Sequence, residues 1–150
     1  MRKAGWIAAA VALGLCLGGC RRGNPKLRLT EAELKTFLEL WPGYHQRLYG
    51  PTPNPVEARK YVASKGVEEH ELLRIVEKLN LAIGVVVARE AVEKAKTDEE
   101  RRTARGALAL TRIVGVPEQS VTLVRKYRDE IGATFKAAGG KSPFDSPETR

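Results

Sequence analysis

Hydrophobic residues recur along most of this chain at the three- and four-residue spacing of amphipathic α-helices. The first such stripe comprises Leu34, Phe37, Leu38 and Trp41. Thr30, with Glu33 three residues later, forms a capping box that predicts where this helix begins. Pro42-Gly43 is expected to break or kink it, because proline lacks an amide proton and clashes with the preceding turn. A short helical segment over 44–49 follows the break.

Two further helices are predicted after a stiff, proline-rich loop at 51–55. Asn54 caps the first of them, with Pro55 at its first position, and this helix ends near Ser64. A long helix is expected from about residue 68 to residue 96. Its stripe comprises Leu72, Val76, Leu79, Ile83 and Val86, and residues 81–88 are apolar almost all round. An apolar circumference indicates burial on all sides, so this helix is expected at the centre, with Gly84 allowing another helix to approach closely.

The remaining sequence predicts two more helices and a tail. Thr97 and Glu100 form a second capping box, and the helix that it begins is expected to end at Val114. A last helix is expected from residue 117 to residue 138. Its stripe comprises Val121, Val124, Tyr127, Ile131 and Phe135. Residues 141–150 are expected to be disordered. The fold class is therefore all-α, a single compact bundle of about five helices over residues 30–140.

The first twenty residues have a different pattern, with no polar face. Arg2 and Lys3 precede an uncharged apolar run from Trp6 to Leu17, and small residues then lead to a cysteine. A charged start, an apolar stretch and small residues are the parts of a secretory signal peptide. An uncleaved membrane anchor is the alternative, but the run is shorter than the ~20 residues that a span needs.

The end of this segment, Leu17-Gly18-Gly19-Cys20, resembles the lipobox of bacterial lipoproteins. That resemblance implies that residues 1–19 are removed and that Cys20 receives a diacylglycerol thioether and an acylated amino group. An ordinary secretory signal that ends near a cysteine remains the alternative. Cys16 is a poorer lipidation site, because Leu15 precedes it where a small residue is required.

Composition limits the partners and the chemistry of the exported chain. Beyond the signal Cys20 is the only cysteine, so no disulfide forms within a monomer and packing alone must stabilise the fold. The 26 lysines and arginines exceed the 18 acidic residues, and only two of the basic residues lie in the signal. This excess favours envelope proteins, wall polymers or anionic lipids as partners, and not nucleic acid, because the chain is exported. Residues 20–29 are expected to be a basic linker between the lipid and the domain.

No catalytic or metal-binding motif stands out. His45 and His70 lie on different predicted helices without a metal-ligand spacing, so neither a metal nor a cofactor is expected. No serine lies in a Gly-x-Ser-x-Gly turn. Glu90, after the apolar run 85–88, is the one candidate for the raised-pKa acid that a wall-degrading glycosidase requires. Its spacing from Lys94 also suits an ordinary ion pair.

Two groups of side chains are candidate binding residues. Arg101, Arg105 and Arg112 fall within about 40° of one another on a helical wheel, and such a ridge suits bidentate binding of phosphate groups. A solvated face or pairing with acids on other helices is the alternative. An aromatic cluster near the proline break is the candidate ligand pocket or partner surface, with core packing as the alternative. This cluster comprises Trp41, Tyr44, Tyr49 and Tyr61.

These observations favour a membrane-anchored lipoprotein that presents a non-enzymatic helical binding domain in the bacterial cell envelope. A cell-wall hydrolase acting through Glu90 and a carrier of an apolar ligand between the helices are the alternatives. Residues 30–96 resemble, loosely, small helical bacterial lipoproteins of unassigned role, and this likeness assigns no residue a function. In a cell with two membranes, Arg21 after the lipidated cysteine favours the outer membrane, because lipoproteins that stay in the inner membrane typically carry aspartate there.

Overall fold

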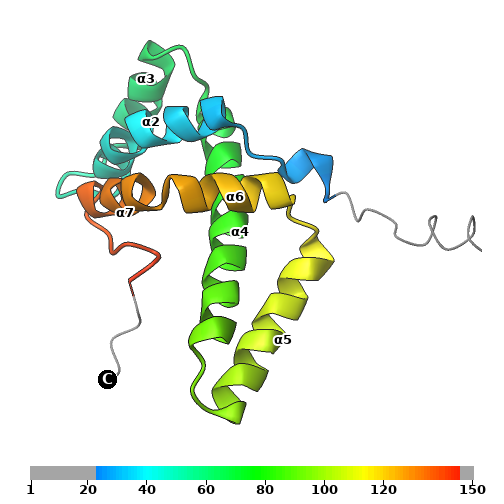
Figure 1. Cartoon of the computed structure of the whole chain (residues 1–150). Helices are drawn as coiled ribbons and strands as arrows, with labels where there is room; N and C mark the ends of the chain where they lie inside the picture. Colours follow the sequence, from blue (N-terminus) through cyan, green and yellow to red (C-terminus); the bar gives the residue numbers. More distant parts are fainter. Residues whose placement is uncertain (1–22, 146–150) are drawn as a thin grey trace, which may run out of the picture.

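The computed structural model describes residues 23–145, which form six α-helices and one short 3-10 turn and contain no strand. The elements are η1 (Pro25–Leu27), α2 (Glu31–Tyr49), α3 (Pro55–Ser64), α4 (Glu69–Lys94), α5 (Asp98–Val114), α6 (Glu118–Lys126) and α7 (Arg128–Ala137). The all-α prediction is confirmed, with six helices in place of about five (Figure 1). The predicted signal peptide and Cys20 lie outside the described residues.

Helix α4 is the centre of the fold, as its apolar sequence predicts. Helices α2, α3, α5 and α6 all pack against it, and α7 packs against α2 and α6. Figure 1 shows α2 and the α6–α7 pair crossing the upper half of α4, whereas α5 runs beside the lower half. The bundle thus has a packed body and a two-helix projection formed by α4 and α5.

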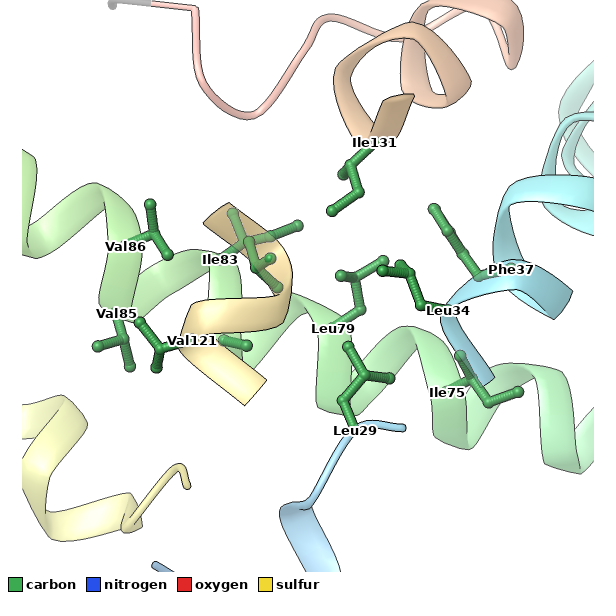
Figure 2. Close-up of a cluster of buried hydrophobic side chains, with 12 residues drawn as sticks. Leu29, Leu34, Phe37, Ile75, Leu79, Ile83, Val85, Val86, Val121 and Ile131 are labelled. Carbon is green, nitrogen blue, oxygen red and sulfur yellow. The ribbon is translucent and has the colours of Figure 1, made fainter. Parts of the chain in front are cut away.

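The main core lies where α2, α4, α6 and α7 meet (Figure 2). Leu34, Phe37 and Leu79 have no exposed surface. Ile131 points into this cluster from α7 and is also fully buried (Figure 2). Full burial of each such side chain contributes about 1.5–3 kcal/mol. A second cluster fills the space between α2, α3 and the start of α4 and comprises Leu40, Tyr44, Ala58, Val62 and Leu72.

Of the break or kink predicted at Pro42-Gly43, the break is wrong, because α2 runs through both residues. Proline inside a helix costs about 3 kcal/mol through its missing hydrogen bond and its clash with the preceding turn. Trp41 and Tyr44 lie on either side of Pro42 and both pack into the core clusters. Their burial requires helical geometry on both sides of the proline and offsets its cost.

The predicted last helix is two helices, α6 and α7, separated at Tyr127. The backbone of Tyr127 departs from helical values, with φ −104° and ψ 23°. Its hydroxyl donates a hydrogen bond to Glu31 at the start of α2, and the next residue, Arg128, pairs with Glu90 of α4. These tertiary contacts are not encoded in the local pattern, which reads as one continuous amphipathic stripe.

The predicted basic linker over residues 20–29 is wrong for residues 23–29, which belong to the domain. Leu29 is buried in the main core. Its amide donates a hydrogen bond of 2.9 Å to the hydroxyl of the fully buried Ser120, and that hydroxyl in turn donates to the carbonyl of Leu27, at 3.4 Å. Residues 23–29 stay attached to the domain because these polar groups form hydrogen bonds with one another.

The prediction that disorder begins at residue 141 is wrong for residues 141–145, and residues 146–150 lie outside the described part. Ser142 is buried against Gly132, where a β-carbon would lie 2.8 Å from the serine hydroxyl. The ring of Phe144 packs on the main core and stacks beneath the Arg128 guanidinium, 4.5 Å from the ring centroid. Phe144 thus fixes the segment after α7 against that helix.

Candidate functional site

Helices α4 and α5, which form a hairpin, carry five of the seven large apolar side chains that are exposed within residues 23–145. Both ends of α5 are fixed as the sequence predicts. The capping box of Thr97 and Glu100 is formed at its start, and Gly115, in the left-handed conformation with φ 74°, follows its last residue. Helix α5 rests on α4 through the buried Ala104 and the half-buried Leu108 and Thr111. The rest of its circumference faces solvent.

An open apolar groove of about 800 Å³ runs between α4 and α5 on one flank of the hairpin. Half of its lining residues are glycine or alanine: Gly84, Ala88, Ala91, Ala95, Ala104 and Ala107. Its lining also includes the charged residues Lys94, Lys96, Glu99 and Glu100. The prediction that Gly84 admits a neighbouring helix is wrong within residues 23–145, because nothing lies within 4 Å of where its β-carbon would be. Val87 of the groove is also exposed, so residues 81–88 are not buried on all sides.

Three large apolar side chains lie exposed on the last turns of α5. Leu110 is 66% exposed, Ile113 82% and Val114 42%. The hydrophobic pattern alone does not identify these residues as exposed, because an apolar residue in an amphipathic helix is expected to face the core. The usable signal was that apolar residues in 98–114 span more of the helix circumference than packing against a single neighbour requires.

The arginine ridge is present on the opposite flank of α5, but its members differ. Arg101 is partly neutralised, because its guanidinium lies 3.2 Å from the Asp98 carboxylate. Arg105 and Arg112 have no carboxylate within 4 Å among residues 23–145. Arg112 also lines a hollow of about 510 Å³ with Arg89, which forms a two-point ion pair with Glu118 at 2.6 Å. Arg105 and Arg112 therefore remain available to an anion.

The beginning of the described chain lies against the end of α5. The amide of Asn24 donates a hydrogen bond of 2.7 Å to the carbonyl of Gly115. A β-carbon on Gly23 would lie 2.6 Å from the α-carbon of Pro117 and 2.8 Å from the Gly115 oxygen. Only glycine permits this approach, so residue 23 is placed beside the C-terminal end of α5.

Glu90 does not have the environment of a general acid. Its carboxylate receives two hydrogen bonds from the Arg128 guanidinium, the second of 3.1 Å, and lies 3.4 Å from the ammonium of Lys94. The hydrogen bond from Arg128, together with the charges of both partners, lowers the pKa of Glu90 below its ordinary value. A glycosidase acid requires the opposite shift, so the ion-pair interpretation of Glu90 is the one that the geometry supports.

The candidate aromatic pocket is largely a packed layer. Trp41 lies 5.7 Å from Phe37 and 5.8 Å from Tyr44, measured between ring centroids, and Tyr61 stacks on the Arg47 guanidinium at 4.2 Å. Tyr49, 67% exposed, lies on the outside of this layer. Core packing therefore accounts for Trp41, Tyr44 and Tyr61.

Tyr44 is held in its protonated form. Burial, followed by its hydrogen bond of 2.8 Å to the Glu69 carboxylate, raises the pKa of Tyr44 to about 12. Glu69 also pairs with Arg59 of α3 at 2.8 Å. The chain from tyrosine through glutamate to arginine joins α2, α4 and α3, which is a structural role.

Three further searches bear on function. Among residues 23–145, no three His, Cys, Asp or Glu side chains are grouped as metal ligands. None of the helices α2 to α7 has the length and apolar character needed to cross a membrane. Comparison of the chain with protein-family models, curated protein sequences and solved structures found no match.

Proposed function

We propose that this chain is an exported bacterial lipoprotein, attached to a membrane through Cys20, whose helical domain binds another envelope protein through the α4–α5 groove. The signal-like pattern of residues 1–20 and the Leu17-Gly18-Gly19-Cys20 motif support the anchor. In a cell with two membranes, Arg21 favours the outer one. The groove supports the binding role.

The observation that carries the binding role is the apolar, small-residue lining of a groove that no described part of the chain fills. Alanine and glycine side chains let a partner helix come close, because interaxial distance is set by the side chains at the contact. The exposed Val87, which lines the groove, offers an apolar contact to such a helix. The partner that fits is an amphipathic helix with an apolar face.

The lipid anchor is tested by labelling with radioactive palmitate in a bacterial host. The wild-type chain is expected to incorporate label and to shorten to the form that begins at Cys20. Cys20→Ser is expected to abolish both, whereas Cys16→Ser, the matched control within the same apolar segment, retains both. Labelling that depends on Cys16, or none at all, would refute the anchor.

The groove is tested by photocrosslinking in the native envelope. A photoreactive amino acid at Thr103 or Ala91, on opposite walls of the groove, is expected to crosslink one and the same protein. Gly84→Leu fills the groove without meeting a neighbour and is expected to abolish the crosslink. Gly106→Leu changes an exposed glycine that is not among the groove-lining residues and has an equally open site, so it serves as the matched control.

The two alternative functions gain no support from the described residues. A hydrolase acting through Glu90 needs a raised pKa there, and the pKa of Glu90 is lowered. A carrier needs an enclosed apolar cavity, and the hollow between α4 and α5 is an open groove.

In the photocrosslinking experiment, crosslinks from the two walls of the groove that differ in partner, or that survive Gly84→Leu, would contradict the binding role.

A further inference from the structure

The end of α5 lies next to the point at which the chain leaves for its proposed lipid anchor. Gly23 is in close contact with Gly115 and Pro117. Gly23 lies three positions after Cys20, and an extended chain covers at most about 11 Å over that distance. A lipid on Cys20 therefore sets the membrane surface close to the last turns of α5, whatever path residues 20–22 take.

The side chains at that end are unusual for a surface in water. Leu110, Ile113 and Val114 are all exposed and fall within about 100° of one another around the helix axis. Exposed apolar residues scattered singly are normal, but a cluster indicates an interaction surface. These three side chains will be called the apolar tip of α5.

The acidic and basic residues of α5 are also distributed unevenly along its length. Its acidic residues, Asp98, Glu99 and Glu100, all lie in the first turn, about 20 Å from the apolar tip at 1.5 Å per residue. From Arg101 onward α5 has four arginines and no acid. Arg105 and Arg112 share the flank that adjoins Ile113, and neither has a carboxylate partner among the described residues.

We propose that the apolar tip of α5 inserts into the interface of the membrane that holds Cys20, with Arg105 and Arg112 binding phosphate groups of anionic lipids. Interfacial helices bind membranes through buried apolar area together with attraction between basic residues and anionic headgroups. The diacylglycerol and the amide-linked acyl chain on Cys20 would already give stable attachment, so this second contact sets the orientation of the domain and does not supply the attachment itself. The proposal rests on the proposed lipid anchor and adds to it the orientation of the domain: the α4–α5 loop points away from the membrane.

The experiment attaches the mature chain, which begins at Cys20, to vesicles through a maleimide lipid. Cys20 is the only thiol of that form, so the attachment does not depend on whether cells lipidate it. Ile113→Trp reports contact with lipid through quenching by bromine-labelled acyl chains. Val56→Trp, at an exposed valine of α3, is the matched control. The native Trp41 gives a constant background that the unmodified chain measures.

On vesicles of phosphatidylcholine and phosphatidylglycerol, the tryptophan at position 113 is expected to lose severalfold more fluorescence than the one at position 56. Equal quenching at the two positions would overturn the proposal, because the domain would then hang freely on its tether. Both sites are exposed, so neither variant should disturb folding, and circular dichroism checks this.

Two further outcomes are decisive. When the mature Ile113→Trp chain is added to the anionic vesicles without the maleimide lipid, Arg105→Gln or Arg112→Gln is expected to weaken its association about fivefold each, which corresponds to ~1 kcal/mol per basic residue at such a surface. Unchanged association would overturn the headgroup contact.

A blue shift of the tryptophan at 113 without vesicles, together with dimers in sedimentation, would assign the tip to a second copy of the chain. Failure of palmitate labelling in cells would refute only the lipid anchor. The vesicle results do not depend on that labelling, so failure of the proposed anchor and failure of the proposed membrane contact are distinguishable.

Discussion

The hydroxyl of Ser120 lies 2.9 Å from the amide nitrogen of Leu29, although 91 positions separate the two residues. Ser120 is fully buried at the start of α6, and Leu29 is the last residue but one before α2. This contact makes residues 23–29 part of the domain. It therefore leaves only residues 20–22 between the described domain and the proposed lipid attachment.

Ser120→Ala is expected to destabilise the domain by about 1–3 kcal/mol, because the buried amide of Leu29 then has no hydrogen-bond partner. Urea unfolding followed by circular dichroism measures the change. Ser64→Ala removes a hydroxyl that is exposed and bonded only to the Tyr61 carbonyl, and it should change stability by less than about 0.5 kcal/mol. Equal effects of the two substitutions would contradict the role given to Ser120.

Glu90→Gln is expected to destabilise the domain at neutral pH by about 1.5 kcal/mol, near the lower limit for hydrogen bonds to charged groups. Its ion pair with Arg128 lowers the pKa of Glu90 below the ordinary 4.5, so this stabilisation is present above that pH and is lost as the pH falls through the lower, folded-state pKa. The difference between wild type and variant should therefore shrink on acidification. Unfolding free energies measured over a pH series test this.

Glu93→Gln is the matched control for the Glu90 experiment. Glu93 lies on the same helix, is exposed and has no ion-pair partner within residues 23–145. It should leave both the stability and its pH dependence nearly unchanged. A pH dependence that both variants share would show that other carboxylates, such as Glu33 or Glu118, dominate the acid response.

Trp41→Phe is expected to change stability by less than about 1 kcal/mol, whereas Trp41→Ala should cost about 3–5 kcal/mol. The indole nitrogen of Trp41 is buried and has no hydrogen-bond partner among the described residues. Phenylalanine keeps much of the aromatic contact with Phe37 and Tyr44 and removes the unpaired donor. A loss with phenylalanine as large as with alanine would show that the donor has a partner in solution.

Gly23→Ala is expected to detach the beginning of the chain from α5, because its β-carbon would lie 2.6 Å from Pro117. Hydrogen exchange at the Asn24 amide, which is bonded to the Gly115 carbonyl, should then lose its protection. Gly106→Ala is the contrasting variant: its site in α5 is open, and it should stabilise the helix by about 0.5–1 kcal/mol. Persistent protection of Asn24 in Gly23→Ala would contradict the contact.

Local signals in the sequence predicted the helices well where short-range chemistry decides the outcome. Thr30 with Glu33 and Thr97 with Glu100 form the expected capping boxes, because both partners lie within one turn of each other. The same locality explains the errors. Pro42 is an unfavourable residue within a helix, and only the packing of Trp41 and Tyr44 on the rest of the bundle offsets it.

The candidate site was predictable in part. That Arg101, Arg105 and Arg112 share one flank follows from helical periodicity alone. The pairing of Arg101 with Asp98 is an i,i+3 contact within α5, so it follows from the same periodicity. The binding of Glu90 by Arg128 from another helix depends on side chains brought together by folding. The exposure of Ile113 likewise depends on which neighbours α5 lacks, and no spacing pattern states that.

The sequence by itself determined that the described domain is all-α, that α4 is its central helix and that basic residues gather on α5, because periodicity, capping and charge are properties of neighbouring residues. Tertiary structure alone decided that α2 continues through Pro42, that residues 23–29 join the core through Ser120 and that the hairpin has a groove without an occupant. These features depend on the balance of burial and hydrogen bonding between segments far apart in the chain, and that balance exists only once the helices have packed.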